Sequence, residues 1–180
     1  MSESLPAVIE PAEAQVRQLP VLVPTSVTEA MQLADMMAQA KLVPAHLQGK
    51  PADCLLIVEQ AARWQMSPFA VAQATSCIQG KLMYEGKLVA AVVNSRGGLA
   101  ERLRYEFDGS GDNRAVTVIG RIRGEAETRT VTVRLGDVKT ANKVWQTQPD
   151  QQLSYCGARV WARRHTPELM LGVQTDDEAV

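Results

Sequence analysis

Aromatic residues, cysteine pairs and long apolar runs are scarce in this 180-residue chain, and each scarcity excludes a class of protein. Aromatics make up only 4% of the sequence, so the hydrophobic 46% must form a largely aliphatic core. No run of eighteen apolar residues occurs, which excludes a membrane-spanning helix. The first fifteen residues lack a basic stretch and a long apolar stretch, so they do not predict a secretory signal. We expect one globular domain in the cytoplasm.

Signatures of metal binding and catalysis are also missing. Cys54, Cys77 and Cys156 are odd in number and far apart, which indicates buried reduced thiols rather than disulfides or a zinc site. His46 and His165 have no metal-ligand spacing. The glycine patterns of nucleotide-binding loops and the GxSxG motif of serine hydrolases do not occur. The sequence therefore predicts a protein that is not an enzyme and that holds no cofactor or metal.

Charge is unevenly distributed, although the net charge is only −1. Residues 1–40 carry one basic and five acidic residues, and residues 165–180 carry four acidic residues and no lysine or arginine. The stretch between them, residues 41–164, carries 18 basic and 11 acidic residues. A basic body between acidic ends is typical of a domain that binds an anion, and nucleic acid is one such partner.

Periodicity and turn residues predict an α+β fold, in which a small β-hairpin and a three-stranded antiparallel sheet pack against about five helices. We expect a flexible arm over residues 1–24, one core domain over residues 25–172 and an acidic tail over residues 173–180. Ser26 and Glu29 form a capping box that begins the first helix, and Pro51, Pro68 and Pro149 suit the first positions of later helices. Helical spacing places Val27, Met31 and Phe69 on buried faces.

The hairpin and the sheet are indicated by alternating residues around turn signals. "CIQGKLMY", residues 77–84, contains a Gln-Gly turn between two short strands and leads into an apolar helix that ends at a Gly-Gly pair. Three alternating segments follow at residues 102–107, 115–123 and 129–135. They predict a meander with one apolar face, whose other face carries several arginines, Arg121 among them.

Two groups of side chains have the chemistry of a single-strand binding site. Lys139, Lys143, Trp145 and Gln146 lie in a polar connector, where the indole could stack on a base beside phosphate contacts or, equally, cover the edge of the core. The final helix carries Tyr155, Arg159 and Arg163 at a spacing of four, followed by Arg164. This stripe suits stacking and phosphate binding, and its alternative is an ordinary solvated face.

Three further cations complete the set of candidates. Lys81 and Lys87 border the hairpin, where they could meet phosphates or simply be solvated. Arg96 ends the helix after the hairpin, where a cation suits the negative end of the helix dipole.

The order of these motifs resembles a known family. "GKPADC", "SPFAVAQ", "IQGK" and "GKLVAAVVNSRG" are followed by a C-terminal block with the pattern W–P–ARVWARR–P–LMLGV. Over roughly residues 40–178, the chain is similar to the RecT/Redβ single-strand annealing proteins of bacteriophages.

The resemblance implies a protein that binds single-stranded DNA and the annealed duplex, and that anneals complementary strands without ATP during homologous recombination. It implies self-association into rings or helical filaments in the cytoplasm of a bacterial host cell. It also implies action together with a phage exonuclease and the host single-strand-binding protein. On this chain, the hairpin at Gln79, Gly80 and Lys81 would border the DNA. The groove would be lined by Lys87, Arg96, Lys139, Lys143, Trp145, Arg159 and Arg163.

Two alternatives remain at the level of sequence. The basic face could be an interaction module that meets an acidic protein partner. The chain could also be a phage nuclease, although its body shows no acidic cluster that suggests a two-metal site.

Overall fold

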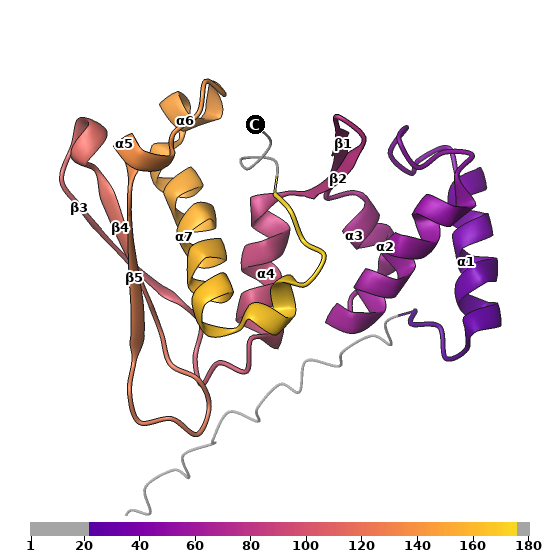
Figure 1. Ribbon diagram of the computed structural model, residues 1–180, viewed down its shortest axis with the longest axis horizontal. Coiled ribbons are helices and arrows are strands. Elements are labelled where there is room, and N and C mark those ends of the chain that lie inside the picture. The colour runs from indigo at the N-terminus through magenta and orange to yellow at the C-terminus, as the bar shows by residue number, and fades with distance from the viewer. Residues whose placement is uncertain (1–21, 176–180) are drawn as a thin grey trace, which may run out of the picture.

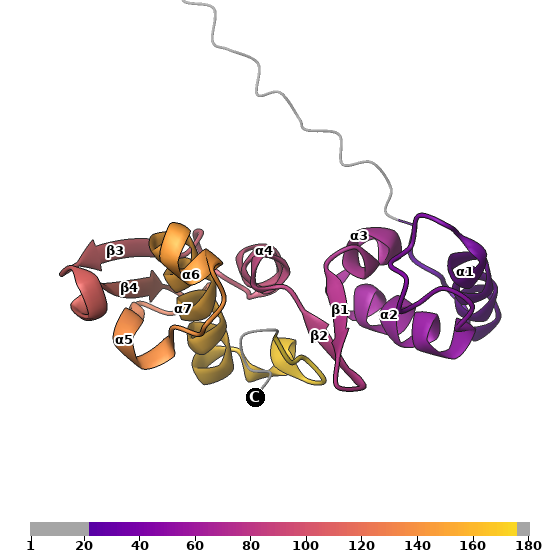
Figure 2. The same ribbon diagram turned by 90° about the horizontal axis from the view of Figure 1, so that it is seen from above.

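The computed structural model describes residues 22–175, which form an elongated molecule with helices at one end and a sheet at the other (Figures 1 and 2). Residues 1–21 of the predicted arm and residues 176–180 of the predicted acidic tail lie outside the described residues. Packing continues through Thr175, whose side chain is buried, so residues 173–175 are part of the folded body.

The α+β prediction is confirmed. Within residues 22–175 the strands are β1 Thr75–Ile78, β2 Lys81–Tyr84, β3 Arg104–Asp108, β4 Ala115–Gly120 and β5 Arg129–Arg134. The helices are α1 Val27–Gln39, α2 Pro51–Trp64, α3 Pro68–Ala72, α4 Gly86–Arg96, α5 Leu135–Val138, α6 Val144–Thr147 and α7 Pro149–His165. The prediction of about five helices corresponds to α1, α2, α3, α4 and α7, and α5 and α6 are additional single turns of four residues in the polar connector.

Helices begin where capping residues and prolines indicate. The Ser26 hydroxyl accepts a hydrogen bond from the Glu29 amide at 3.2 Å, as a capping box requires. The Glu29 carboxylate turns outward to Thr25, where it accepts from both the amide and the hydroxyl at 2.8 Å. Proline occupies the first turn of α2, α3 and α7, where its missing N–H leaves no helical bond unmade.

The hairpin turn has the predicted geometry. β1 and β2 pair antiparallel with Ile78 opposite Lys81, which leaves a two-residue loop. Gln79 and Gly80 have φ angles of 51° and 77°, both in the left-handed region. Two consecutive left-handed residues define a type I′ turn, whose twist matches that of the flanking strands.

The three-stranded sheet has the order β3-β4-β5 with antiparallel neighbours, as predicted. Its inner face carries Val116, Val118, Val131 and Val133, all buried, and α7 packs against it. The outer face is polar, and the Thr117 and Thr132 hydroxyls lie 3.0 Å apart across two strands.

Three of the predicted buried positions are wrong. Val27 and Met31 are 77% and 54% exposed, because α1 turns Leu33, Ala34 and Met37 toward α2 instead. Phe69 is also exposed, since the short helix α3 buries Val71 and Ala72. Among the cysteines, Cys54 and Cys156 are buried as predicted, whereas Cys77 on the hairpin is exposed.

The helical end and the sheet end are joined through α2, α4 and the last described residues. Arg96 donates from Nε to the Trp64 carbonyl at 2.9 Å, and the Trp64 indole donates to the Leu169 carbonyl at 3.2 Å. Residues 171–175, which we name the return segment, run back to the hairpin, where the Tyr84 amide donates to the Gln174 carbonyl at 2.7 Å. No helix in residues 22–175 is both long and apolar enough to cross a membrane.

Candidate nucleic-acid interface

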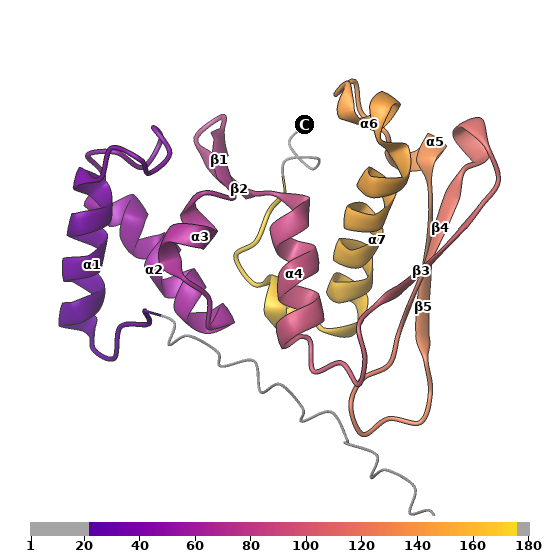
Figure 3. The same cartoon turned by 180° about the vertical axis from the view of Figure 1, so that it is seen from behind.

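A pocket of about 270 Å³ lies between the beginnings of α4 and α7. Both helices start along the upper edge of the molecule in Figures 1 and 3, the edge that also carries the hairpin tip and α6. We call it the α4–α7 pocket, and it is lined by Glu85, Gly86, Lys87, Gln148, Gln151, Gln152, Tyr155, Cys156 and Arg159. The helices have 11 and 17 residues, so their positive dipole ends favour an anion here.

Gly86 allows the two helices to approach this closely. A Cβ atom at residue 86 would lie 3.0 Å from the Tyr155 Cβ, which is tighter than ordinary van der Waals contact. A glycine at this point therefore gives the pocket its narrow wall, with the Tyr155 ring beside it. The Tyr155 hydroxyl accepts a hydrogen bond from the Gln151 amide at 2.6 Å, which orients both side chains.

Arg159 supplies a fixed positive charge in the wall of the pocket. Its residue is only 8% exposed, so it does not belong to a solvated stripe. One guanidinium nitrogen donates to the Thr175 hydroxyl, and another donates to the Cys156 sulfur at 3.2 Å. These two partners hold the guanidinium in one orientation.

Lys87 stands at the mouth of the pocket and forms an ion pair with Glu85. The hydrogen bond that Lys87 donates to this carboxylate, together with the carboxylate charge, raises the pKa of Lys87. Lys139 likewise pairs with Asp112 at 2.6 Å. Both predicted cations therefore have an acidic neighbour that a phosphate would have to displace.

Other candidate residues lie along the same upper edge of the molecule in Figure 1. Lys81 leads out of the hairpin turn, and Lys143 and Gln146 lie at α6, on the opposite side of α4 in the view from above (Figure 2). All three are exposed, and neither lysine has an ion pair within residues 22–175. Lys81 also borders a second pocket, of about 580 Å³, between α2, β2 and the return segment.

The structure buries Trp145 instead of presenting it for stacking. The residue is 4% exposed and belongs to the hydrophobic core. This is the alternative that the sequence left open, so the indole does not line the interface in this conformation. The single turn of α6 turns Trp145 inward, while Gln146 next to it stays exposed.

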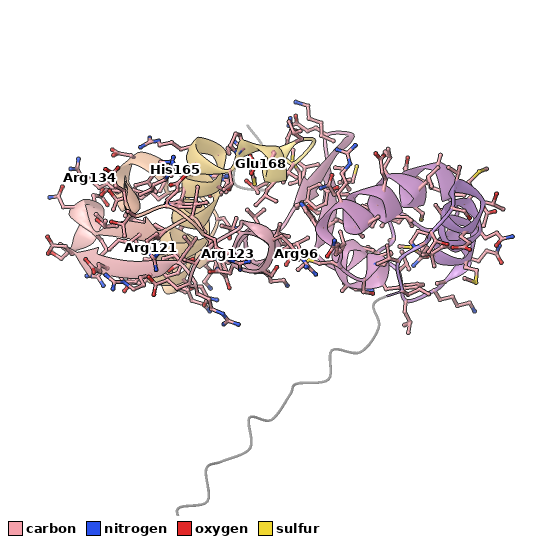
Figure 4. The ribbon with its side chains drawn as sticks, turned by 90° about the horizontal axis from the view of Figure 1, so that it is seen from below. Arg96, Arg121, Arg123, Arg134, His165 and Glu168 are labelled. Atoms are coloured by element: carbon pink, nitrogen blue, oxygen red, sulfur yellow. The ribbon has the colours of Figure 1, made fainter. Side chains whose placement is uncertain are left out.

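Three of the predicted arginines lie apart from the α4–α7 pocket. Arg96 closes the C-terminal end of α2, where it donates to the Trp64 and Gln65 carbonyls at 2.9 and 3.1 Å. Arg121 borders a pocket of about 210 Å³ at the outer face of the sheet. Arg164 is exposed in the last turn of α7. Figure 4 shows Arg121, Arg123 and Arg96 in a row that runs from the sheet to α4.

Arg163 takes an intermediate place. It is exposed on the last turn of α7 and donates to the Val173 carbonyl at 3.3 Å, so it helps to hold the return segment. Tyr155, Arg159 and Arg163 thus follow one another along one side of the helix, as predicted, but their side chains contact different parts of the molecule. Tyr155 and Arg159 line the pocket, and Arg163 contacts the backbone that follows it.

Sequence reasoning missed the amides and the closing residue of this site. Gln148, Gln151 and Gln152 line the pocket from the first turn of α7. The signal was present as "QPDQQ", which places several amides around a helix start. Thr175 carried no comparable signal, because its partner Arg159 is sixteen residues away on another element.

The comparison with known proteins now decides the family. The family model described as RecT family matches residues 91–180, half of the chain. The chain belongs to the RecT family. The match covers the second half of α4, the sheet and α7 with Arg159, whereas the hairpin lies before it. A search of the curated proteins found no match.

Proposed function

We propose that this RecT-family protein binds single-stranded DNA and anneals complementary strands during homologous recombination, without ATP and without covalent catalysis. The observation that carries the proposal is the α4–α7 pocket, where a buried Arg159, Lys87, three glutamine amides and two helix N-termini converge. Family membership supports the same class of ligand.

Each feature of the pocket suits a phosphate backbone. Arg159 and Lys87 offer charge-assisted hydrogen bonds to phosphate oxygens, and the amides offer neutral ones. The ring of Tyr155 provides a surface for stacking that does not depend on sequence. A strand held in this way by its backbone keeps most base edges exposed for pairing.

Two effects of binding would promote annealing: neutralisation of the phosphates and an extended conformation of the bound strand. Cations that neutralise phosphates reduce the repulsion between two strands. A strand already held in an extended form loses less conformational entropy when it pairs. We further propose that copies of the chain associate on DNA as rings or helical filaments, with a phage exonuclease and the host single-strand-binding protein as partners. Electron microscopy of the protein with two complementary oligonucleotides tests the assembly.

The binding test is fluorescence anisotropy with a labelled oligo-dT over a range of salt concentrations. We expect the logarithm of the association constant to fall linearly with the logarithm of salt, with a slope of about −0.7 per phosphate contact. Absence of binding at low salt contradicts the proposal. Cleavage of labelled DNA with magnesium would instead favour a nuclease, and binding only to an acidic protein would favour an interaction module.

Lys87→Gln locates the site. The change removes one cation and leaves the Glu85 carboxylate without its lysine partner, so we expect affinity to fall about 3- to 10-fold. The salt slope should become less steep by about 0.7. Arg121→Gln is the matched control, because it removes one cation from the outer face of the sheet. Equal losses in both variants would show that net charge alone governs binding.

A further inference from the structure

The pocket of about 210 Å³ on the outer face of the sheet, which we call the outer-face pocket, is lined mainly by arginines and threonines. Arg104 on β3 and Thr130 on β5 pair with the same residue of the central strand, so their side chains share this face. Arg102 and Arg121 border the pocket just beyond the ends of their strands, and Thr128 adds a second hydroxyl. Three guanidinium groups therefore surround a polar floor.

Backbone hydrogen bonds fix the positions of these arginines relative to one another. The segment after α4 pairs with the chain that leaves β4, where the Ala100 amide donates to the Arg121 carbonyl at 2.8 Å. The Arg123 amide donates to the Gly98 carbonyl at 2.8 Å. Arg102 follows directly on this paired segment, so the rim of the outer-face pocket is built from two chain segments that hold each other in place.

The charge of the outer-face pocket is largely available to a ligand. Glu101 is the only acidic residue in its described lining, against three arginines. Arg102 and Arg121 have no ion pair within residues 22–175, and Arg104 pairs with Glu106 at 3.4 Å. Both side chains of that pair are more than 60% exposed, so the interaction is weak. Guanidinium groups beside hydroxyls suit phosphate oxygens.

The cations continue beyond the outer-face pocket. Figure 4 shows Arg121, Arg123 and Arg96 in a row from the sheet to the end of α4. Arg96 is exposed, and its partners are carbonyl oxygens, which do not cancel its charge. A row of cations of this kind suits a chain of phosphates better than a single small anion.

The row and the α4–α7 pocket lie at opposite ends of α4. Gly86, the first residue of the helix, lines the α4–α7 pocket, and Arg96 is the last residue. A helix of 11 residues is about 15 Å long. Salt screens charges over about 10 Å at 0.1 M, so phosphates bound at the two ends repel each other only weakly. Both sites can therefore be occupied at once.

We propose that the outer-face pocket and the arginine row bind the backbone of a second segment of single-stranded DNA while the α4–α7 pocket holds the first. This inference rests on the proposed function, since it adds a second site for the same class of ligand. The cations of the second site are largely exposed, so it is the weaker site and fills after the first. A strand held there stays close to the first strand, which raises its effective concentration for pairing.

The first test measures capture of a second strand that cannot pair with the first. Immobilised oligo-dT binds the protein, unbound protein is washed away, and a fluorescent oligo-dT is added at low salt. Two thymine strands do not form Watson–Crick pairs, so the retained fluorescence reports a second binding site. We expect Arg102→Gln with Arg121→Gln to lower the retention about 3- to 10-fold, while affinity for a single short oligo-dT changes less than about twofold.

Lys41→Gln with Arg134→Gln is the matched control. This pair of changes removes the same charge from two exposed positions outside the linings of both pockets. We expect retention and first-strand affinity to stay within about twofold of the unaltered protein. An equal loss of retention in both double variants would show that net charge alone governs capture, and it would overturn the second site.

A second measurement locates the bound strand. Phenylglyoxal modifies accessible arginines, and mass spectrometry identifies the modified positions. We expect saturating oligo-dT to protect Arg102 and Arg121, with Arg134, farther along the sheet in Figure 4, as the unprotected reference. The protection should persist in Lys87→Gln at saturating DNA, because that change weakens only the α4–α7 pocket.

The outcomes separate the second site from the proposed function. Equal retention by the unaltered protein and by the Arg102 and Arg121 double variant overturns the second site, as do arginines that react equally with and without oligo-dT. Protection by polyglutamate but not by oligo-dT also overturns it and assigns the outer-face pocket to an acidic protein segment. If Lys87→Gln leaves first-strand affinity unchanged, the α4–α7 site is contradicted, but protection of Arg102 and Arg121 still supports the outer-face pocket.

Discussion

At the scale of single residues, His165 is the clearest source of pH dependence. Its ring lies 5.0 Å from the Trp161 ring, and its Nε2 atom is buried without a hydrogen-bond partner among residues 22–175. Burial lowers the pKa of His165, and the charges of Arg129 and Arg164 lower it further. A hydrogen bond with the Thr130 backbone and the charge of Glu125 oppose these effects without reversing them.

The lowered pKa predicts a loss of stability in mild acid. The unfolded chain takes up the proton near the ordinary histidine value of 6.5, before the folded protein does. The free energy of unfolding should therefore decrease as the pH falls below about 6.5. Melting temperatures of the unaltered protein and of His165→Phe, measured from about pH 8 to about pH 5, test this. The variant keeps a ring beside Trp161 and should lose less stability.

His46 is a second source of acid sensitivity, which His165→Phe does not remove. Burial lowers its pKa too, so some acid sensitivity should remain in His165→Phe. His46→Gln in the same background should remove part of the remainder. Parallel profiles for the unaltered protein and His165→Phe would contradict the role of His165.

Residue types and spacing could predict which side chains carry charge, but not which ones are buried. Tyr155, Arg159 and Arg163 have the spacing of a solvated stripe, yet Arg159 is buried because the return segment covers it. Trp145 lies in a polar stretch, yet it is in the core. For Arg159 the decisive contact comes from Thr175 on another element, and a local pattern carries no information about it.

At the scale of elements, the packing of α7 on the sheet depends on Gly157. A Cβ atom at this position would lie 2.6 Å from the Val118 Cγ2 and 3.2 Å from the Val116 Cγ1, both in the middle of β4. The glycine thus gives the helix its close approach to the sheet, at the cost of lower helix propensity. Helix propensity alone would favour another residue here, so the contact with the sheet is what requires the glycine.

Gly157→Ala should therefore destabilise the protein, even though alanine favours helices. Because β4 is the central strand, the clash forces α7 outward, and we expect a loss of about 1–3 kcal/mol in the free energy of unfolding. Urea denaturation followed by far-UV circular dichroism measures it. Gln151→Ala, at an exposed position of the same helix, should stay within about 0.5 kcal/mol. A stabilised Gly157→Ala would contradict this account of the packing.

Element boundaries were the most predictable part of the fold. Ser26, Pro51 and Pro149 mark helix starts through interactions within a few residues, and the structure places helices there. The Gln79-Gly80 turn is equally local, since two left-handed residues suffice to reverse the strand. Which face of a helix is buried is less predictable, as Met31 and Phe69 show, because the neighbouring element decides it.

At the scale of the whole molecule, chain segments far apart in sequence join the helical end to the sheet end. Arg96 closes α2 from the end of α4, and the Trp64 indole reaches the Leu169 carbonyl. Trp64 also meets the edge of Tyr84, with ring centroids 5.4 Å apart. The return segment then pairs with Tyr84 and Arg159. Among these residues Arg159 also lines the α4–α7 pocket, so it links the fold to the proposed DNA site.

Thr175→Val tests this coupling between fold and site. Valine has nearly the same shape as threonine but lacks the hydroxyl that accepts from Arg159, so a buried cation loses one of its acceptors. We expect the free energy of unfolding to fall by about 1–3 kcal/mol in urea denaturation. Affinity for oligo-dT should fall as well, because Arg159 is no longer held in one orientation.

Gln174→Ala is the matched control for the return segment. Gln174 is exposed and contacts Tyr84 through its backbone carbonyl, which alanine retains, so stability should change by less than about 0.5 kcal/mol. A loss of stability equal to that of Thr175→Val would show that any change in the segment loosens it. A stable Thr175→Val with unchanged DNA affinity would show that the Arg159 hydrogen bond to Thr175 supports neither the fold nor the site.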